Sequence, residues 1–280
     1  MEPYLPRPDD LLPIALTIVF GLIPFITYLY RRGRDISAVL IPETYHLLES
    51  LESHLIRGIC KLFLCRKQAI TPELSGVLKH LINRLSTILG PRYLHAMIRE
   101  RVLSSFQRAL RASDTYRHHW EETAAWLTYL VFMDEVMSFV QSSLRLNMVF
   151  LPLPNAARTI ILFRRHLIAN RQPVEKLILR LFRKRLFDTS TGESQLLQVL
   201  VDVYAAHAIS AEPLLTDQQV HVIASRAAQA MIDAMGSLAI QENRKGLKMP
   251  RQLVAEIVLR VGMDQALYSL ERFLAPSATN

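Results

Sequence analysis

The hydrophobic pattern opens on an uninterrupted apolar segment, Leu11–Tyr30. It contains twenty residues without a charge, and Arg31, Arg32 and Arg34 follow it directly. Twenty helical residues at about 1.5 Å each span about 30 Å, the hydrocarbon thickness of a bilayer. Because a helix satisfies its own backbone hydrogen bonds, it is the economical way through lipid. The pattern therefore predicts a single-pass transmembrane anchor over residues 11–30.

Three other interpretations of this segment are open. A cleaved signal peptide needs a basic start and a small-residue cleavage site, but residues 1–10 carry three acids against one arginine, and no A-x-A follows. A core helix rarely contains twenty uncharged residues. Pro13 and Pro24 are also compatible with a re-entrant hairpin. For the anchor, the positive-inside rule places the three arginines in the cytosol.

The rest of the chain has helical periodicity. From Glu43 onward, large apolar residues recur at steps of three and four, the spacing of one buried helix face. Pro42 indicates a break before this pattern. We divide the chain into an extracytosolic leader (1–10), the anchor (11–30), a basic juxtamembrane linker (31–42), a helical domain (43–275) and a frayed tail (276–280).

Capping signals place several helix starts. Thr71-Pro72-Glu73 reads as an N-cap, a first-turn proline and a first-turn acid, and Thr216 with Gln219 forms a capping box. Neither sustained strand alternation nor a fixed-period repeat is visible. We expect an all-α domain of about seven to nine helices, over residues 43–65, 72–89, 92–112, 116–144, 159–185 (divided at Gln172-Pro173), 192–210, 216–242 and 250–274.

Two stretches are apolar almost all round, Ala124–Val140 and Leu196–Ile209. The first could pass for a second membrane span, but it contains Asp134 and Glu135, and each such charge costs about 2.5–3.5 kcal/mol at a bilayer centre. We interpret both as core helices. The proline-containing loop at 147–157 has large apolar side chains, and it either inserts into a membrane or is buried.

Positive charge is concentrated in one window, Arg158–Arg185. It holds nine Lys or Arg against one acid, which equals the net charge of +8 of the whole chain. Within it, five apolar residues fall on one helical face and four cations on the other. We predict that this basic face binds a partner or lipid, through Arg164, Arg165, Lys176, Arg180, Arg183 and Lys184.

The alternative is that this face is the solvated outer side of a packed helix. If it binds, anionic lipid comes first, at about 1 kcal/mol per cation near the surface. An acidic protein comes second. Nucleic acid comes third, because neither a known module nor an aromatic stacking series accompanies the charge.

The familiar catalytic signatures are absent. The nine glycines are never closer than ten residues apart, which excludes the usual P-loop and dinucleotide fingerprints. Two cysteines, Cys60 and Cys65, cannot build a disulfide framework or a C-x-x-C zinc module. His118 and Glu122 have i, i+4 spacing, which on a helix gives either a salt bridge or an acid–base or metal pair. We predict neither cofactor nor metal.

These observations favour a membrane-anchored adaptor, receptor or tether that presents its domain to the cytosol from an organelle or bacterial inner membrane. The alternative is a membrane-bound enzyme for a lipid or isoprenoid substrate. Its acids would be drawn from Glu121, Glu122, Asp134, Glu135 and Asp202. A third interpretation is a structural component of a larger membrane complex. Acids converging in one pocket would favour the enzyme.

Overall fold

The computed structural model describes residues 23–65, 70–89, 95–147, 155–208 and 215–274. These ranges contain nine α-helices, one short 3-10 turn and no strand, so the all-α prediction is confirmed. The first twelve residues of the proposed anchor and residues 148–154 of the predicted 147–157 loop lie outside them. The two ends of that loop are helical, because α5 runs to Asn147 and α6 begins at Asn155. The helices are α2 (Ile23–Leu64), α3 (Pro72–Leu89), α4 (His95–Ser113), α5 (Glu121–Asn147), α6 (Asn155–Ala169), α7 (Arg171–Lys184), α8 (Ser190–Ala208), α9 (Asp217–Lys245) and α10 (Arg251–Leu274).

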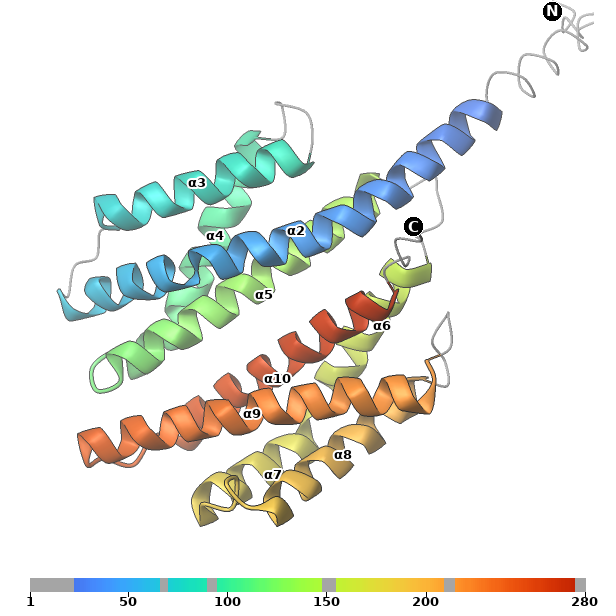
Figure 1. Ribbon diagram of the computed structural model, residues 1–280. Helices are drawn as coiled ribbons and strands as arrows, with labels where there is room; N and C mark the ends of the chain where they lie inside the picture. Colours follow the sequence, from blue (N-terminus) through green and yellow to red (C-terminus); the bar gives the residue numbers. More distant parts are fainter. Residues whose placement is uncertain (1–22, 66–69, 90–94, 148–154, 209–214, 275–280) are drawn as a thin grey trace, which may run out of the picture.

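The helices form two groups joined along α5 and α10 (Figure 1). In the first group α2 packs on α3 and α5, and α4 packs on α3 and α5. In the second group α10 packs on α6, α7 and α9, while α8 packs on α6, α7 and α9. Because α5 and α10 also contact each other, one continuous hydrophobic core runs through both groups.

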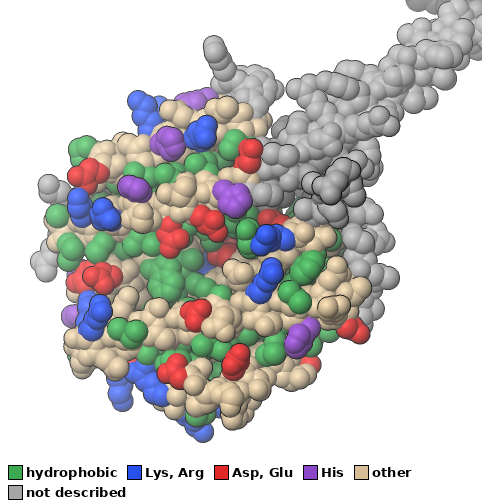
Figure 2. All heavy atoms as spheres, viewed as in Figure 1, with side chains coloured by type: hydrophobic (Ala, Val, Ile, Leu, Met, Phe, Trp, Pro, Cys, Tyr) green, Lys and Arg blue, Asp and Glu red, His purple; other side chains and the backbone are tan. Residues whose placement is uncertain are grey.

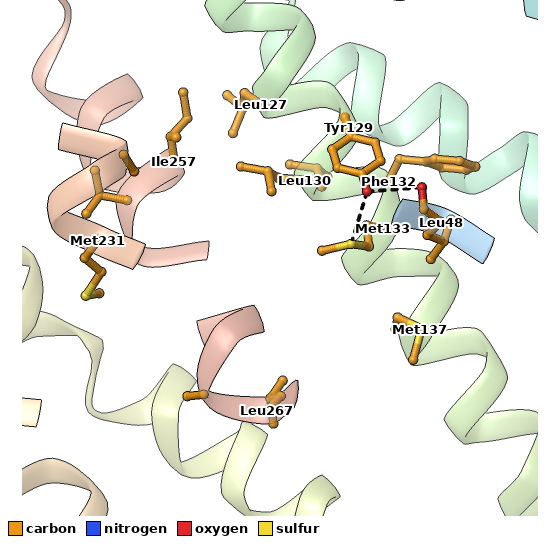
Figure 3. Packing of buried hydrophobic residues seen from close by; sticks show 14 of the residues in the cluster. Leu48, Leu127, Tyr129, Leu130, Phe132, Met133, Met137, Met231, Ile257 and Leu267 are labelled. Atoms are coloured by element: carbon orange, nitrogen blue, oxygen red, sulfur yellow. Dashed lines mark hydrogen bonds between the residues drawn. The ribbon is translucent and has the colours of Figure 1, made fainter. Parts of the chain in front are cut away.

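Helix α5 is the centre of this core. Figure 3 shows Leu127 and Leu130 directed towards Ile257 of α10, and Tyr129 directed towards Leu48 of α2. The Tyr129 hydroxyl donates to the Leu48 carbonyl oxygen at 3.3 Å, which gives this buried polar atom a partner. An apolar helix contacted on several sides is the expected solution for a sequence without a polar face.

By length and composition alone, one stretch of the described chain, Glu121–Ser143, is apolar enough to cross a membrane. Of its most apolar window, 67% is buried inside the protein. This burial agrees with the interpretation of α5 as a core helix.

Helix α2 corrects one boundary prediction. The sequence predicted a break at Pro42, but the helix is continuous from Ile23 to Leu64 and includes residues 31–42, which were expected to be a linker. A proline removes one backbone hydrogen bond from a helix interior. From Tyr45 onward the apolar side of α2 is buried, and this packing supplies stabilisation that local propensity does not. Figure 1 shows the N-terminal end of α2 extending beyond the other helices.

The predicted helix caps are confirmed, whereas the break between the two helices of the basic window lies at a different residue from the predicted one. The Leu74 backbone N–H donates to the Thr71 hydroxyl at 3.3 Å, and the Thr216 capping box is formed in both directions. The break within the basic window falls at Asn170 rather than at Gln172-Pro173. Pro173 lies in the first turn of α7, where a missing N–H costs no intrahelical bond.

Helix α8 is less buried than predicted. Leu196, Leu200 and Tyr204, four residues apart, form its buried side, while Asp202 is exposed. Several Val and Leu side chains on its flanks are only half-buried. The expectation of a core helix buried all round is therefore wrong for α8.

Candidate functional site

Helix α7 has the two faces that its sequence predicts. Its apolar residues are buried against the body: Val174, Leu177, Ile178, Leu181 and Phe182. On the other side, Lys176, Arg180, Arg183 and Lys184 are exposed. Because the apolar face is used in packing, α7 cannot insert that face into a membrane. The exposed cations remain accessible to a partner.

The C-terminal end of α7 is fixed to the end of α9. Arg185 follows the helix with a left-handed backbone (φ 54°), and its guanidinium pairs with Glu242 of α9. The same guanidinium lies 5.2 Å from the centre of the Phe182 ring. Arg185 is exposed but engaged with Glu242 and Phe182, whereas the exposed Arg183 and Lys184 beside it form no ion pair within the described residues.

The other predicted binding residues divide into two groups. Arg165 is exposed on α6. Arg164, next to it, has only 15% of its side-chain surface exposed and pairs with Asp134 of α5, so it does not belong to the exposed basic face. Arg31, Arg32 and Arg34 lie within the backbone of α2, but their side chains are outside the described part of the structure.

Arg171 at the start of α7 pairs with Glu175 and Glu256, whereas the four cations of the exposed side have no carboxylate partner among the described residues. Within the described residues, Arg180 donates to the neutral Gln195 side chain at 2.6 Å, and Lys176, Arg183 and Lys184 form no ion pair. In the view of Figure 2, Lys and Arg side chains gather at the lower edge, where α7 and α8 lie in Figure 1. Over the rest of that face, cations and acids alternate, which is the ordinary composition of a solvated surface.

A second polar cluster begins inside the protein, where α5, α6 and α10 meet, and reaches the surface at the start of α7. Asp134 accepts from Arg164, and its other carboxylate oxygen accepts from Arg260 at 2.8 Å. Arg260 also lies 3.6 Å from Glu256, which is 3.7 Å from Arg171 at the start of α7. This chain of alternating charges, the Asp134 cluster, links three helices of the second group to α5. Sequence reasoning missed it, because its members come from distant parts of the chain.

Further along α10 lie two acids, the buried Glu271 and the half-buried Asp264. Among the described residues, both carboxylate oxygens of Glu271 and the buried Oδ2 of Asp264 have no hydrogen-bond partner. Burial raises the pKa of Asp264 well above its ordinary value, and the negative charge of Asp134 adds to the effect. Burial also raises the pKa of Glu271 to about 8. The pKa of the nearby Tyr45 hydroxyl is raised by its own burial and by the charges of Glu271 and Asp264.

The five acids proposed for an enzyme do not converge. Glu121 pairs with Lys245 at one end of the body, Glu135 pairs with Arg108 on α4, and Asp202 is exposed on α8. Glu122 is exposed, and Asp134 is neutralised by two arginines. His118 lies in the turn before α5 and not on it, so the i, i+4 pairing expected with Glu122 does not arise.

Within the described residues, no group of three or more His, Cys, Asp or Glu side chains is placed to bind a metal ion. Comparison with known proteins finds no matching family model, no matching curated protein and no matching solved structure. The physical arrangement is therefore the basis for any functional assignment.

The Asp134 cluster generates a stability prediction. Changing Asp134→Asn leaves two largely buried arginines without a full counter-charge, and we expect a loss of about 3–5 kcal/mol in the free energy of unfolding. The matched control is the neighbouring Glu135→Gln, which breaks a more exposed pair with Arg108 and should cost at most about 1 kcal/mol. Chemical denaturation of the full-length protein in detergent, followed by circular dichroism, measures both. Equal losses would contradict a special role for Asp134.

The buried Glu271 generates a pH prediction. Its carboxyl keeps a proton up to about pH 8 in the folded protein but only to about 4.5, its ordinary value, in the unfolded chain. The folded state therefore binds more protons in that interval, and this group lowers stability as pH rises from about 4.5 to 8.

Changing Glu271→Gln removes the ionisation, so we expect the variant to gain stability over the wild type between pH 5 and pH 9. Unfolding free energies at a series of pH values test this. The exposed Glu193→Gln should follow the wild type at every pH. A constant difference between Glu271→Gln and the wild type would show that Glu271 does not titrate in this range.

Proposed function

We propose that the protein is a membrane-anchored tether that presents the cationic side of α7 to an acidic protein partner. Residues 11–30 form the anchor in this proposal, and the body faces the cytosol because Arg31, Arg32 and Arg34 follow the anchor. The observation that carries the proposal is the exposed side of α7, where Lys176, Arg180, Arg183 and Lys184 lie without carboxylate partners among the described residues.

The continuity of α2 supports the anchor. Ile23–Tyr30, the second part of the uncharged segment, opens a helix that runs into the body without interruption. The helical conformation that a bilayer requires is thus already present where the segment enters the body. A helix end that extends beyond the other elements is also compatible with lipid around it (Figure 1).

The place of the cations favours a protein partner over the lipid of the anchor's own membrane. Burial raises the pKa of the Cys60 thiol, the charges of Glu122 and Glu121 raise it further, and the charge of Lys245 lowers it. The last part of α2 therefore lies near these three charged groups. Lys245 ends α9, and α9 also holds the end of α7 through Glu242 and Arg185. The end of α7 therefore belongs to the same end of the body as Cys60.

This end of the body is far from the anchor. From Tyr30 to Cys60, thirty helical residues cover about 45 Å along α2. The attraction of an anionic lipid surface falls off within about 10 Å. Even with a tilted α2, Arg183 and Lys184 lie beyond that range. An acidic partner that approaches from the cytosol does not meet this restriction.

The enzyme is the weaker proposal. Its expected signature was a convergence of acids in one pocket, and four of the five acids lie apart from the cavity that adjoins Asp134. Asp134 itself is engaged by Arg164 and Arg260, so both oxygens of its carboxylate already have partners within the protein.

Reversing the charge of the α7 side tests the tether. In full-length protein reconstituted into nanodiscs of neutral lipid, we expect K176E/R180E/R183E/K184E to weaken binding of a fluorescent ten-residue glutamate peptide by about tenfold or more, because four attractive contacts become repulsive. Binding by the wild type should also weaken as salt concentration rises.

The matched control carries the same charge change elsewhere. Lys79, Arg84, Arg99 and Arg101 are exposed on α3 and α4, and K79E/R84E/R99E/R101E should bind the peptide nearly as well as the wild type. If both variants lose affinity equally, net charge and not α7 is responsible. If only added anionic vesicles bind, and the α7 variant loses that binding, the partner is a second membrane and not a protein.

The anchor has a separate test. We expect the wild-type protein to stay with membranes after an alkaline carbonate wash. The double variant Phe20→Arg, Leu22→Arg should be released, because each arginine costs about 2.5–3.5 kcal/mol near a bilayer centre. Ile240→Arg, at an exposed position of α9, is the control and should stay in the membrane fraction. Release of the wild type would contradict the anchor and leave the α7 surface untouched.

A further inference from the structure

A groove of about 360 Å³ lies between α3 and α4, which pack against each other at the outer edge of the first helix group (Figure 1). Its volume is within the range of small-molecule sites, about 300–1,000 Å³. Apolar and polar side chains both line it, and no acid is among the described residues that do so. The groove is separate from the Asp134 cluster and from the cationic side of α7.

The spacing of residues along the two helices places polar side chains on the groove. Ser75, Lys79 and Asn83 are four residues apart, so they share one side of α3, and all three line the groove. On α4, His95 and Arg99 have the same spacing. Nε2 of His95 lies 3.3 Å from Oδ1 of Asn83, which joins the two helices. Lys79 and Arg99 therefore enter the groove from different helices.

These two cations have no counter-charge. Lys79 and Arg99 are exposed and form no ion pair within the described residues. The single acid of α3, Glu73, pairs with Lys61 of α2 at 2.8 Å. The single acid of α4, Glu100, does not line the groove. Two like charges that share a groove repel each other, and an anion placed between them interacts favourably with both.

The rest of the groove is apolar. Leu78 and Ile82 close its floor, with 2% and 5% of their surface exposed. Ile70 keeps 37% of its surface exposed, and Leu103 is half-buried. An apolar group on the ligand can cover these two side chains and remove their surface from water. The groove thus selects a ligand with both an anionic and an apolar part.

We propose that this groove binds a phosphate monoester that carries a small apolar group. The two negative charges of the phosphate match the two cations, Lys79 and Arg99, and both side chains are common phosphate donors. The apolar group lies against Ile70 and Leu103. A monoanion leaves one cation unmatched, and a cation is repelled. The site is independent of the anchor and of the cationic side of α7.

The test follows methyl signals of the groove in full-length protein, labelled with 13C at the isoleucine and leucine methyl groups, in nanodiscs of neutral lipid. At about pH 7.5 phenyl phosphate is a dianion, since the second pKa of a phosphate ester is about 6. We expect it to cause saturable shifts in the signals of Ile82 and Leu103, which line the groove. The exposed Ile240 on α9 should not respond.

Two analogues separate the contribution of the charge from that of the ring. Phenyl sulfate has the same shape but one negative charge, and methyl phosphate has both charges but no ring. We expect each to bind at least about fivefold more weakly than phenyl phosphate, because the first loses one ion pair and the second loses the apolar contact. Equal affinity for either analogue would overturn the proposal.

Substitution of the two cations tests the site itself. K79M/R99M removes both charges and keeps side chains of similar length, and we expect it to bind phenyl phosphate at least about tenfold more weakly. The matched control R84M/R101M removes two exposed cations of the same helices that do not line the groove, and it should bind like the wild type. Equal losses would overturn the site. If K79M/R99M does not fold, the ranking of the three ligands on the wild type decides.

A phosphate monoester can come from a soluble molecule or from the head group of phosphatidic acid, and vesicles of neutral lipid with added phosphatidic acid distinguish these sources. Vesicle binding that is lost in K79M/R99M assigns the phosphate to a lipid. Shifts with phenyl phosphate without vesicle binding assign it to a soluble ligand. Neither response would overturn the proposal. The glutamate peptide that probes α7 has neither a dianionic nor an apolar group, so the two sites are tested with different probes.

Discussion

The packing of the two helix groups against each other depends on the ion pairs that hold the Asp134 carboxylate where the groups meet. Asp134 projects from the central helix α5 and is bound by Arg164 of α6 and Arg260 of α10. Breaking such a buried arrangement costs more than forming it contributes, because any member left alone keeps its desolvated charge. The arrangement of α6 and α10 around α5 is therefore specified by polar contacts, while the surrounding leucines and phenylalanines supply most of the hydrophobic stabilisation.

Internal ion pairs of this kind also explain why only some cations of the basic window are available at the surface. Arg164 and Arg171 belong to the basic window of the sequence, but they form ion pairs within the protein, Arg164 with Asp134 and Arg171 with Glu256. Arg185 likewise forms an ion pair with Glu242. Among the described side chains of this window, the exposed cations without an ion pair are Arg165 on α6 and four residues on one side of α7, so a window that is basic throughout produces a narrower exposed surface.

Local sequence signals predicted much of the fold. The capping box at Thr216, the proline start of α3 and the two faces of α7 depend on contacts within a few residues, and the structure has all three. The partners of Arg164 and Arg260 depend on positions 30 and 126 residues away from Asp134, and nothing local indicates them. Helix α2 passes Pro42 because tertiary packing outweighs one lost hydrogen bond. The cavity that adjoins Asp134 could not be predicted from the sequence either, since the residues that line it come from six helices.

Helix α2 also determines how the body would move if residues 11–30 lie in a bilayer. A Gly- or Ser-rich linker lets a domain explore a wide volume, whereas a continuous helix transmits the orientation of its buried end. The body would then stand at a nearly constant height and turn mainly about the axis of α2. A continuous α2 would therefore act as a molecular ruler, because the number of its helical residues sets the distance from the bilayer at which the body meets a partner. Inserting or removing helical residues would change both this distance and the direction that the body faces.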